Sequence, residues 1–99
     1  MSDSEFLSVT FQFEGAEHSS LIRKKRKSNH IEYSITVMNG ELEKVLFGNH
    51  ILKEINGVLE IDQIIPSDKQ SQLKLAIAKE LKKYLASPDH NREIAEVNH

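Results

Sequence analysis

The sequence predicts an α+β fold, in which an antiparallel β-meander of five to six strands is followed by one C-terminal amphipathic helix packed on the sheet. Three observations indicate it: apolar and polar residues alternate in the first third of the chain, two Asn-Gly dipeptides mark turns, and the apolar period changes after Pro66. The 99 residues suffice for one hydrophobic core. We therefore expect a single domain over 1–88 and a polar, frayed tail over 89–99.

Strands are expected at 6–14 and 31–37, because apolar side chains recur at every second residue there, and a second strand is expected between them at 17–24, where Leu21 and Ile22 supply apolar contacts before the positive charge begins. Gly15 ends the first strand, and residues 25–29 are predicted to form the tip of the hairpin between the second and the third. The apolar residues that should share one face are Leu7, Val9, Phe11 and Phe13 in the first strand and Ile31, Tyr33, Ile35 and Val37 in the third.

The two Asn-Gly dipeptides predict hairpins, since both central residues of a type I′ turn need a positive φ, which Asn and Gly tolerate best. Asn39-Gly40 should lead into a strand over 41–47, and Asn56-Gly57 should join strands over 50–55 and 58–65. The second hairpin predicts cross-strand pairs that match in character, namely Ile55 with Val58, Lys53 with Glu60 and Leu52 with Ile61. The first pairs less well, because Val45 and Phe47 then point away from the core, so the fourth strand needs a bulge or cover on both faces.

The segment after Pro66 predicts a helix of about five turns that ends near Pro88. Ser67 and Gln70 have the spacing of a capping box, and Asp68 suits the positive end of the helix dipole. One stripe should face the sheet and consists of Leu73, Ile77, Leu81 and Tyr84, with Ala76 and Leu85 at its margins. Lys79, Lys82 and Lys83 occupy the opposite face, and Leu75 projects among them.

Composition excludes several classes of protein. The chain has no cysteine, so a disulfide framework, a thiolate metal site and a cysteine nucleophile are excluded. The N-terminus is acidic where a secretory signal is basic, and the longest run of aliphatic or aromatic residues, Val45-Leu46-Phe47, is far shorter than a membrane span. We therefore expect a soluble, cytoplasmic protein that is not an integral membrane protein.

Candidate catalytic groups are few, and each has a structural interpretation. All four glycines fall at predicted turns, and the five histidines lack the spacing of metal ligands. Paired carboxylates occur at Glu41 with Glu43 and at Glu60 with Asp62, but the alternation places them in solvent. The histidines are interpreted as solvated residues of turns and strand ends, and the alternative is a histidine–carboxylate site assembled by folding, for instance from His50 and Asp62. We expect no metal and no cofactor, and an enzyme using His50 remains an alternative.

One local segment differs clearly in composition from the rest of the chain, a run of five adjacent basic residues that we call the basic pentapeptide. Arg23, Lys24, Lys25, Arg26 and Lys27 carry a charge of +5, whereas the remaining eight basic and fifteen acidic residues leave −7 for the rest of the chain. Such a string binds nucleic-acid phosphates, lipid headgroups or an acidic protein surface, or it is a nuclear address. The structural alternative is a solvated hairpin tip whose lysines protect a sheet edge from aggregation.

These patterns predict a small non-enzymatic binding or adaptor module that contacts an anionic partner, such as an acidic protein surface or another polyanion, through residues 23–27. The alternative is a structural protein that self-associates, for instance as a homodimer, through a sheet edge such as 6–14 or through the helix face around Leu75. Positive charge gathers both at 23–27 and on the helix. Whether the two meet in space is a question for the structure.

Overall fold

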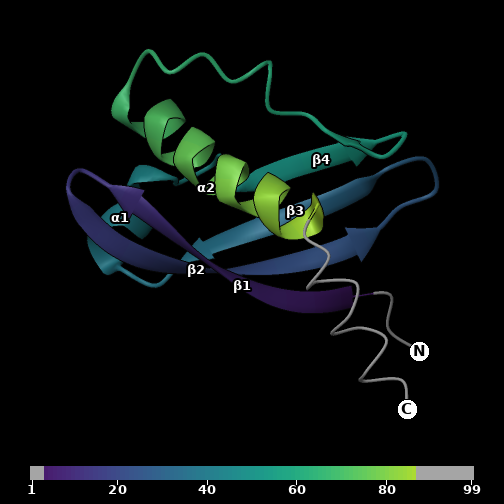
Figure 1. Cartoon of the computed structure of the whole chain (residues 1–99), viewed down its shortest axis with the longest axis horizontal. Coiled ribbons are helices and arrows are strands. Elements are labelled where there is room, and N and C mark those ends of the chain that lie inside the picture. Colours follow the sequence, from purple (N-terminus) through teal and green to yellow (C-terminus); the bar gives the residue numbers. More distant parts are fainter. Residues whose placement is uncertain (1–3, 87–99) are drawn as a thin grey trace.

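The computed structural model of the chain describes residues 4–86, in which five antiparallel strands form one sheet and a long helix crosses one of its faces (Figure 1). The strands follow one another across the sheet in sequence order, which confirms the predicted α+β meander with a C-terminal helix. The tail expected over 89–99, and Pro88, lie outside the described residues. In chain order the elements are β1 (Ser4–Phe13), β2 (Ala16–Arg26), β3 (Ile31–Val37), α1 (Gly40–Val45), β4 (Ile51–Ile55), β5 (Val58–Leu59) and α2 (Lys69–Ala86).

Two tight turns set the register of the outer hairpins. Glu14 and Gly15 both have positive φ, 51° and 80°, and Asn56 and Gly57 have 55° and 81°, as a type I′ turn requires. Phe13 therefore pairs with Ala16 and Ile55 with Val58. The Lys53 carbonyl accepts a hydrogen bond from the Glu60 amide at 2.8 Å, which continues the predicted register of the second hairpin.

The prediction of a strand over 41–47 is wrong, because helix α1 occupies most of this segment. Asn39 is extended, with φ −150°, and its side-chain Oδ1 accepts a hydrogen bond from the Leu42 amide at 3.1 Å. Asn39-Gly40 is thus a helix N-cap and not a hairpin turn. Leu42 and Leu46, one helical turn apart, are both buried. A helix therefore needs neither the bulge nor the cover on both faces that a strand over 41–47 requires. β3 instead pairs directly with β4, with Tyr33 opposite Leu52.

The strand predicted over 58–65 is also shorter than expected, since β5 contains only Val58 and Leu59. The Ile64 amide donates to the Ile61 carbonyl at 3.1 Å, so the chain turns away from the sheet at this point. Residues 60–68 then cross over to the start of α2, as the green connection in Figure 1 shows. β4 therefore has a partner strand along only part of its outer edge.

The core lies between the sheet and α2. The predicted helix stripe is confirmed at Leu73, Ile77 and Leu81, which are fully buried, and Ala78 joins them. Its partners in the sheet are the residues predicted to face inward from β1 and β3, together with Ile22, Leu52 and Leu59. Ser20 on β2 is fully buried as well, and its hydroxyl has no hydrogen-bond partner among residues 4–86.

The start of α2 differs from the predicted capping box. Asp68 Oδ1 accepts a hydrogen bond from the Ser71 amide at 2.8 Å, and the Asp68 amide donates to Ser71 Oγ at 3.1 Å. Asp68 is therefore the N-cap, and the hydrogen bonds from Ser71 lower the pKa of its carboxyl. Gln70, released from capping, instead donates to the Val45 carbonyl at 3.1 Å and so ties α2 to the end of α1.

Candidate functional site

The basic pentapeptide lies mostly within a strand and not at a hairpin tip. Arg23 through Arg26 belong to β2, and only Lys27 is in the connection to β3. The strand extends this far because each basic residue has a partner on β3, with Lys25 opposite Glu32 and Arg26 opposite Ile31. A carboxylate directly across the ladder reduces the repulsion among adjacent cations.

Strand geometry divides these cations between the two faces of the sheet. Lys24 and Arg26 share the side of buried Ile22, which is the face that α2 covers. Arg23 and Lys25 therefore point to the opposite face, which none of the described helices covers (Figure 1). The string of five charges in the sequence thus becomes two separate groups in space.

On the open face, Glu32 is surrounded by basic groups. Lys25 of β2 and Lys53 of β4 are its neighbours on either side of the ladder, Lys27 Nζ lies 4.0 Å from its Oε1, and His30 Nε2 lies 3.1 Å from its Oε2. The hydrogen bond from His30 lowers the pKa of the Glu32 carboxyl, and Lys27 and Lys53 lower it further. Glu32 therefore stays ionised and holds these side chains together.

We call this group the basic face and define it by the four cations Arg23, Lys25, Lys27 and Lys53 around Glu32. Its four cations outnumber the two carboxylates beside them, Glu32 and Glu60, the latter opposite Lys53 in the register, so the face is positive. The next row of the ladder adds exposed apolar surface, because Phe6 pairs with Arg23 and Ile51 with Ser34. Charged and apolar groups lie side by side here, as they do at protein interfaces.

On the covered face, Lys24 meets one lysine of the helix. Lys24 and Lys82 line a hollow of about 440 Å³ at the C-terminal end of α2, together with Tyr33 and Glu54. The Tyr33 hydroxyl donates to Glu54 Oε1 at 2.5 Å, and burial together with this carboxylate raises the pKa of Tyr33. Lys79 and Lys83 line a different hollow with half-buried Leu75. Within residues 4–86, the two positive regions of the sequence therefore come together at this hollow, which Lys24 and Lys82 both line.

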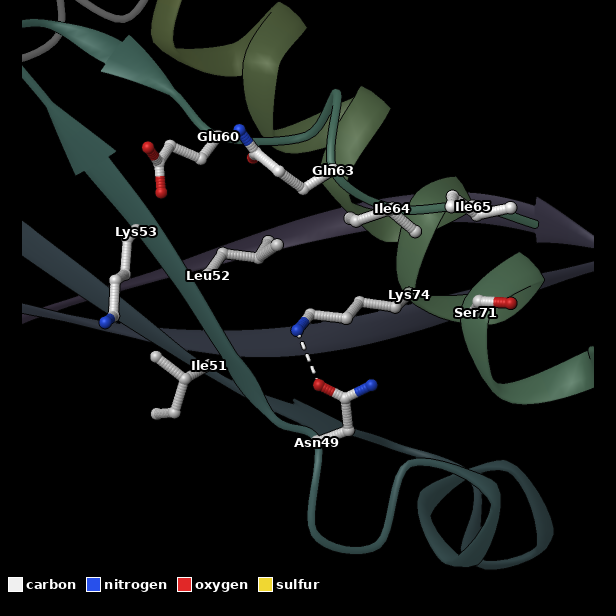
Figure 2. Close-up of a pocket in the computed structure, with 10 residues that line it drawn as sticks. All are labelled: Asn49, Ile51, Leu52, Lys53, Glu60, Gln63, Ile64, Ile65, Ser71 and Lys74. Atoms are coloured by element: carbon white, nitrogen blue, oxygen red, sulfur yellow. Dashed lines mark hydrogen bonds between the residues drawn. The ribbon is translucent and has the colours of Figure 1, made fainter. Parts of the chain in front are cut away.

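A third hollow, of about 410 Å³, lies between β4 and the first turns of α2 (Figure 2). Lys74 extends into it from α2, and its Nζ donates to Asn49 Oδ1 at 2.6 Å. Isoleucines form much of the remaining wall, from β4 and from the connection that follows β5. We call it the Lys74 pocket.

Sequence reasoning missed Lys74, although the sequence contains a signal for it. Lys74 precedes Ala78, Leu81 and Leu85 by four, seven and eleven residues, the spacing of one helix face. A lysine on an inward-facing side of a helix places its ammonium where solvent is restricted. Burial accordingly lowers the pKa of Lys74.

The alternative pairing of His50 with Asp62 does not form. His50 Nε2 lies 3.1 Å from Oε2 of Glu43, a residue of α1 that also accepts a hydrogen bond from the Val37 amide at 2.9 Å. Asp62 is exposed in the connection after β5. Within the described range 4–86, no group of three or more His, Cys, Asp or Glu residues is placed to hold a metal ion.

Comparison of the chain with protein-family models, with curated proteins and with solved structures found no match in any of the three. Among residues 4–86, no helix is both long enough and apolar enough to cross a membrane. Function is therefore inferred from the basic face and the three lysine-lined hollows.

Proposed function

We propose that the protein is a non-enzymatic binding module that contacts an anionic partner through the basic face. The observation that supports this is the meeting of Arg23 and Lys25 of β2 with Lys53 of β4 on an open sheet surface around one carboxylate. Lys53 is far from the pentapeptide in sequence, so folding adds a cation to the cluster that the basic string itself does not contain. Exposed Phe6 and Ile51 beside it supply apolar contact.

An acidic protein surface suits this site better than a long polyanion. The residues outside the pentapeptide carry a net charge of −7, so a nucleic acid extending past the basic face meets repulsion from the rest of the molecule. A partner with a compact acidic patch engages the basic face without this cost. Apolar groups of such a partner contact the exposed side chains of Phe6 and Ile51.

The two faces of β2 provide a matched test of this proposal. The double variant R23Q/K25Q removes one arginine and one lysine from the open face, and K24Q/R26Q removes the same two residue types from the covered face. We expect R23Q/K25Q to weaken binding to a polyglutamate peptide by about 30-fold at low salt, since each basic residue near an anionic surface contributes roughly a fivefold gain. K24Q/R26Q should bind within about threefold of the wild type.

Binding is measured by fluorescence anisotropy over a salt series, with heparin as the extended polyanion for comparison. Equal losses in the two double variants contradict the proposal, because net charge and not the basic face then controls binding. Failure of the wild type to bind either polyanion also contradicts it. Tighter binding of heparin than of polyglutamate at matched charge removes the preference for a compact acidic partner.

The second candidate function is self-association through the free edge of β1. This strand is ten residues long and lies at one end of the strand order, so no strand in the described part of the chain pairs with its outer side. Long unpaired edges are sites of strand addition. The Phe13–Ala16 turn directs the amides of odd-numbered residues such as Val9 toward β2, which leaves the Thr10 amide on the free edge.

Thr10→Pro tests this candidate, since proline removes a donor from the free edge without breaking the β1–β2 ladder. If the edge mediates self-association, light scattering gives a dimer mass for the wild type at high concentration and a monomer mass for T10P, with similar melting temperatures. A wild type that stays monomeric across the concentration series rules out this function. A T10P variant that remains dimeric excludes the β1 edge as the contact.

A further inference from the structure

The Lys74 pocket exists because two segments of the chain separate. The ladder between β4 and the residues after β5 ends with the hydrogen bond from Glu60 to Lys53, and the chain then turns toward α2. The space left between β4, this connection and α2 has a volume of about 410 Å³, within the range of small-molecule sites. Figure 2 shows Lys74 reaching across its floor toward Asn49.

Lys74 is a half-buried cation without a carboxylate partner. Its hydrogen bond goes to the neutral amide of Asn49, and no carboxylate of residues 4–86 lies within the 4.0 Å of an ion pair. Glu60 also lines the pocket but comes from the opposite end of it in Figure 2. A cation removed from water is costly unless an anion compensates it.

The orientation of Asn49 is determined by its own partners. Its Nδ2 donates to Gln70 Oε1 at 3.1 Å, and Gln70 Nε2 in turn donates to the carbonyls of Val45 at 3.1 Å and Phe47 at 3.4 Å. The Asn49 carbonyl oxygen must therefore face Lys74. This chain of hydrogen bonds from α1 holds the ammonium in place at the pocket, which is the preorganisation that a binding site needs.

The rest of the pocket is suited to an apolar group. Ile64 and Ile65 line it, and Ile65 is largely exposed, at 72%, whereas Ile51 at its rim points away from Lys74 onto the open face of the sheet. Figure 2 places Ile64 and Ile65 on the side of Lys74 opposite Asn49. Two isoleucines next to an ammonium that has no carboxylate partner among residues 4–86 have the character of a site for a molecule with an anionic head and an aliphatic tail.

We propose that the Lys74 pocket binds a small organic carboxylate, whose carboxylate group pairs with the Lys74 ammonium and whose aliphatic tail lies against Ile64 and Ile65. A monocarboxylate matches the single cation, and the neutral Asn49 amide positions that cation without competing for its charge. The pocket and the basic face lie on opposite sides of β4, and Ile51 and Lys53 of this strand border both. Binding of a carboxylate here does not depend on the proposed function.

The test is a titration of the full chain with butanoate, hexanoate and octanoate, in which two-dimensional nitrogen–proton NMR spectra are recorded at each ligand concentration. We expect saturable shifts at the amides of Asn49, Ile51, Ile64, Ile65 and Lys74, with affinity rising with tail length. Hexanamide, the neutral counterpart of hexanoate, should bind at least about tenfold more weakly to the wild type. This comparison needs no variant and therefore does not depend on the folding of one.

Two lysine variants on the same helix complete the test. Lys74→Met keeps the length of the apolar stem and removes the charge, so it should lose hexanoate binding by at least about tenfold. Lys79→Met, on the exposed side of α2, should bind like the wild type. The proposal is overturned if none of the three carboxylates gives saturable shifts at the pocket, if hexanamide binds as tightly as hexanoate, or if K74M retains the affinity of the wild type.

Discussion

Replacing Leu73 with alanine is expected to lower the free energy of unfolding by about 2–5 kcal/mol, whereas the same change at Leu75 should cost about 1 kcal/mol or less. Leu73 is fully buried between α2 and the sheet, so its truncation leaves a cavity in a close-packed core. Leu75 is only half-buried at the surface of the same helix, where water fills the space that its side chain leaves. The pair isolates burial, because residue type, helix and substitution are identical.

Urea and thermal unfolding followed by circular dichroism measure both variants. A loss of 2 kcal/mol corresponds to a fall in melting temperature of at least about 8 °C for a domain of this size. Because small domains are stable by only about 5–15 kcal/mol, L73A is expected to be close to unfolding at 37 °C. Similar losses for L73A and L75A are incompatible with the packing of α2 described above.

Replacing Ser20 with alanine is expected to stabilise the protein, by about 1–3 kcal/mol. The Ser20 side chain is fully buried, and its hydroxyl has no hydrogen-bond partner among the described residues. On the ladder its neighbours are Val9 and Val37, which offer no side-chain polar group. A buried hydroxyl without a partner costs roughly 1–3 kcal/mol, and alanine removes the hydroxyl while leaving a cavity no larger than one oxygen atom.

Ser19→Ala is the matched control, because Ser19 is the neighbouring residue on the same strand and is exposed on the open face of the sheet. Its truncation should change the free energy of unfolding by no more than about 0.5 kcal/mol. Both values come from urea unfolding at one temperature. A destabilised S20A variant shows that the hydroxyl has a partner in solution and refutes the unpaired assignment.

Tight turns show how far local sequence predicts this fold. Glu14-Gly15 and Asn56-Gly57 adopt the positive φ angles that a two-residue hairpin needs, and the registers on either side follow from them. The Asn56-Gly57 turn is predictable because Asn and Gly themselves tolerate positive φ, whereas at the first turn Gly15 alone has this preference and Glu14 does not. The alternating residues of β1 and β3 face inward for a similarly local reason, the two-residue repeat of a strand.

Asn39-Gly40 shows where local sequence is insufficient. The same dipeptide as at 56–57 here caps helix α1, with Asn39 extended and bonded to the Leu42 amide. The choice between turn and cap depends on where Leu42 and Leu46 are buried, and on the contact of Gln70 with the end of α1. Those contacts are made by residues distant in sequence, so no local preference reports them.

The candidate sites divide in the same way. The +5 charge of residues 23–27 is visible in the sequence, but the two-residue repeat of β2 separates it into two faces, and pairing with β3 and β4 brings Lys53 to one of them. Lys74 has a recognisable helical spacing, yet its environment depends on the separation of β4 from the chain after β5.

The sequence by itself determined the fold class, the inward faces of the long strands, the core stripe of α2 and the existence of a strongly basic segment. Each of these follows from a short-range repeat or from the conformational preference of a few adjacent residues. Tertiary structure alone decided the helical state of 40–45, the early end of β5, the composition of the basic face and the burial of Lys74. Each of these depends on contacts between distant segments, whose free energies exceed the small local preferences that a sequence displays.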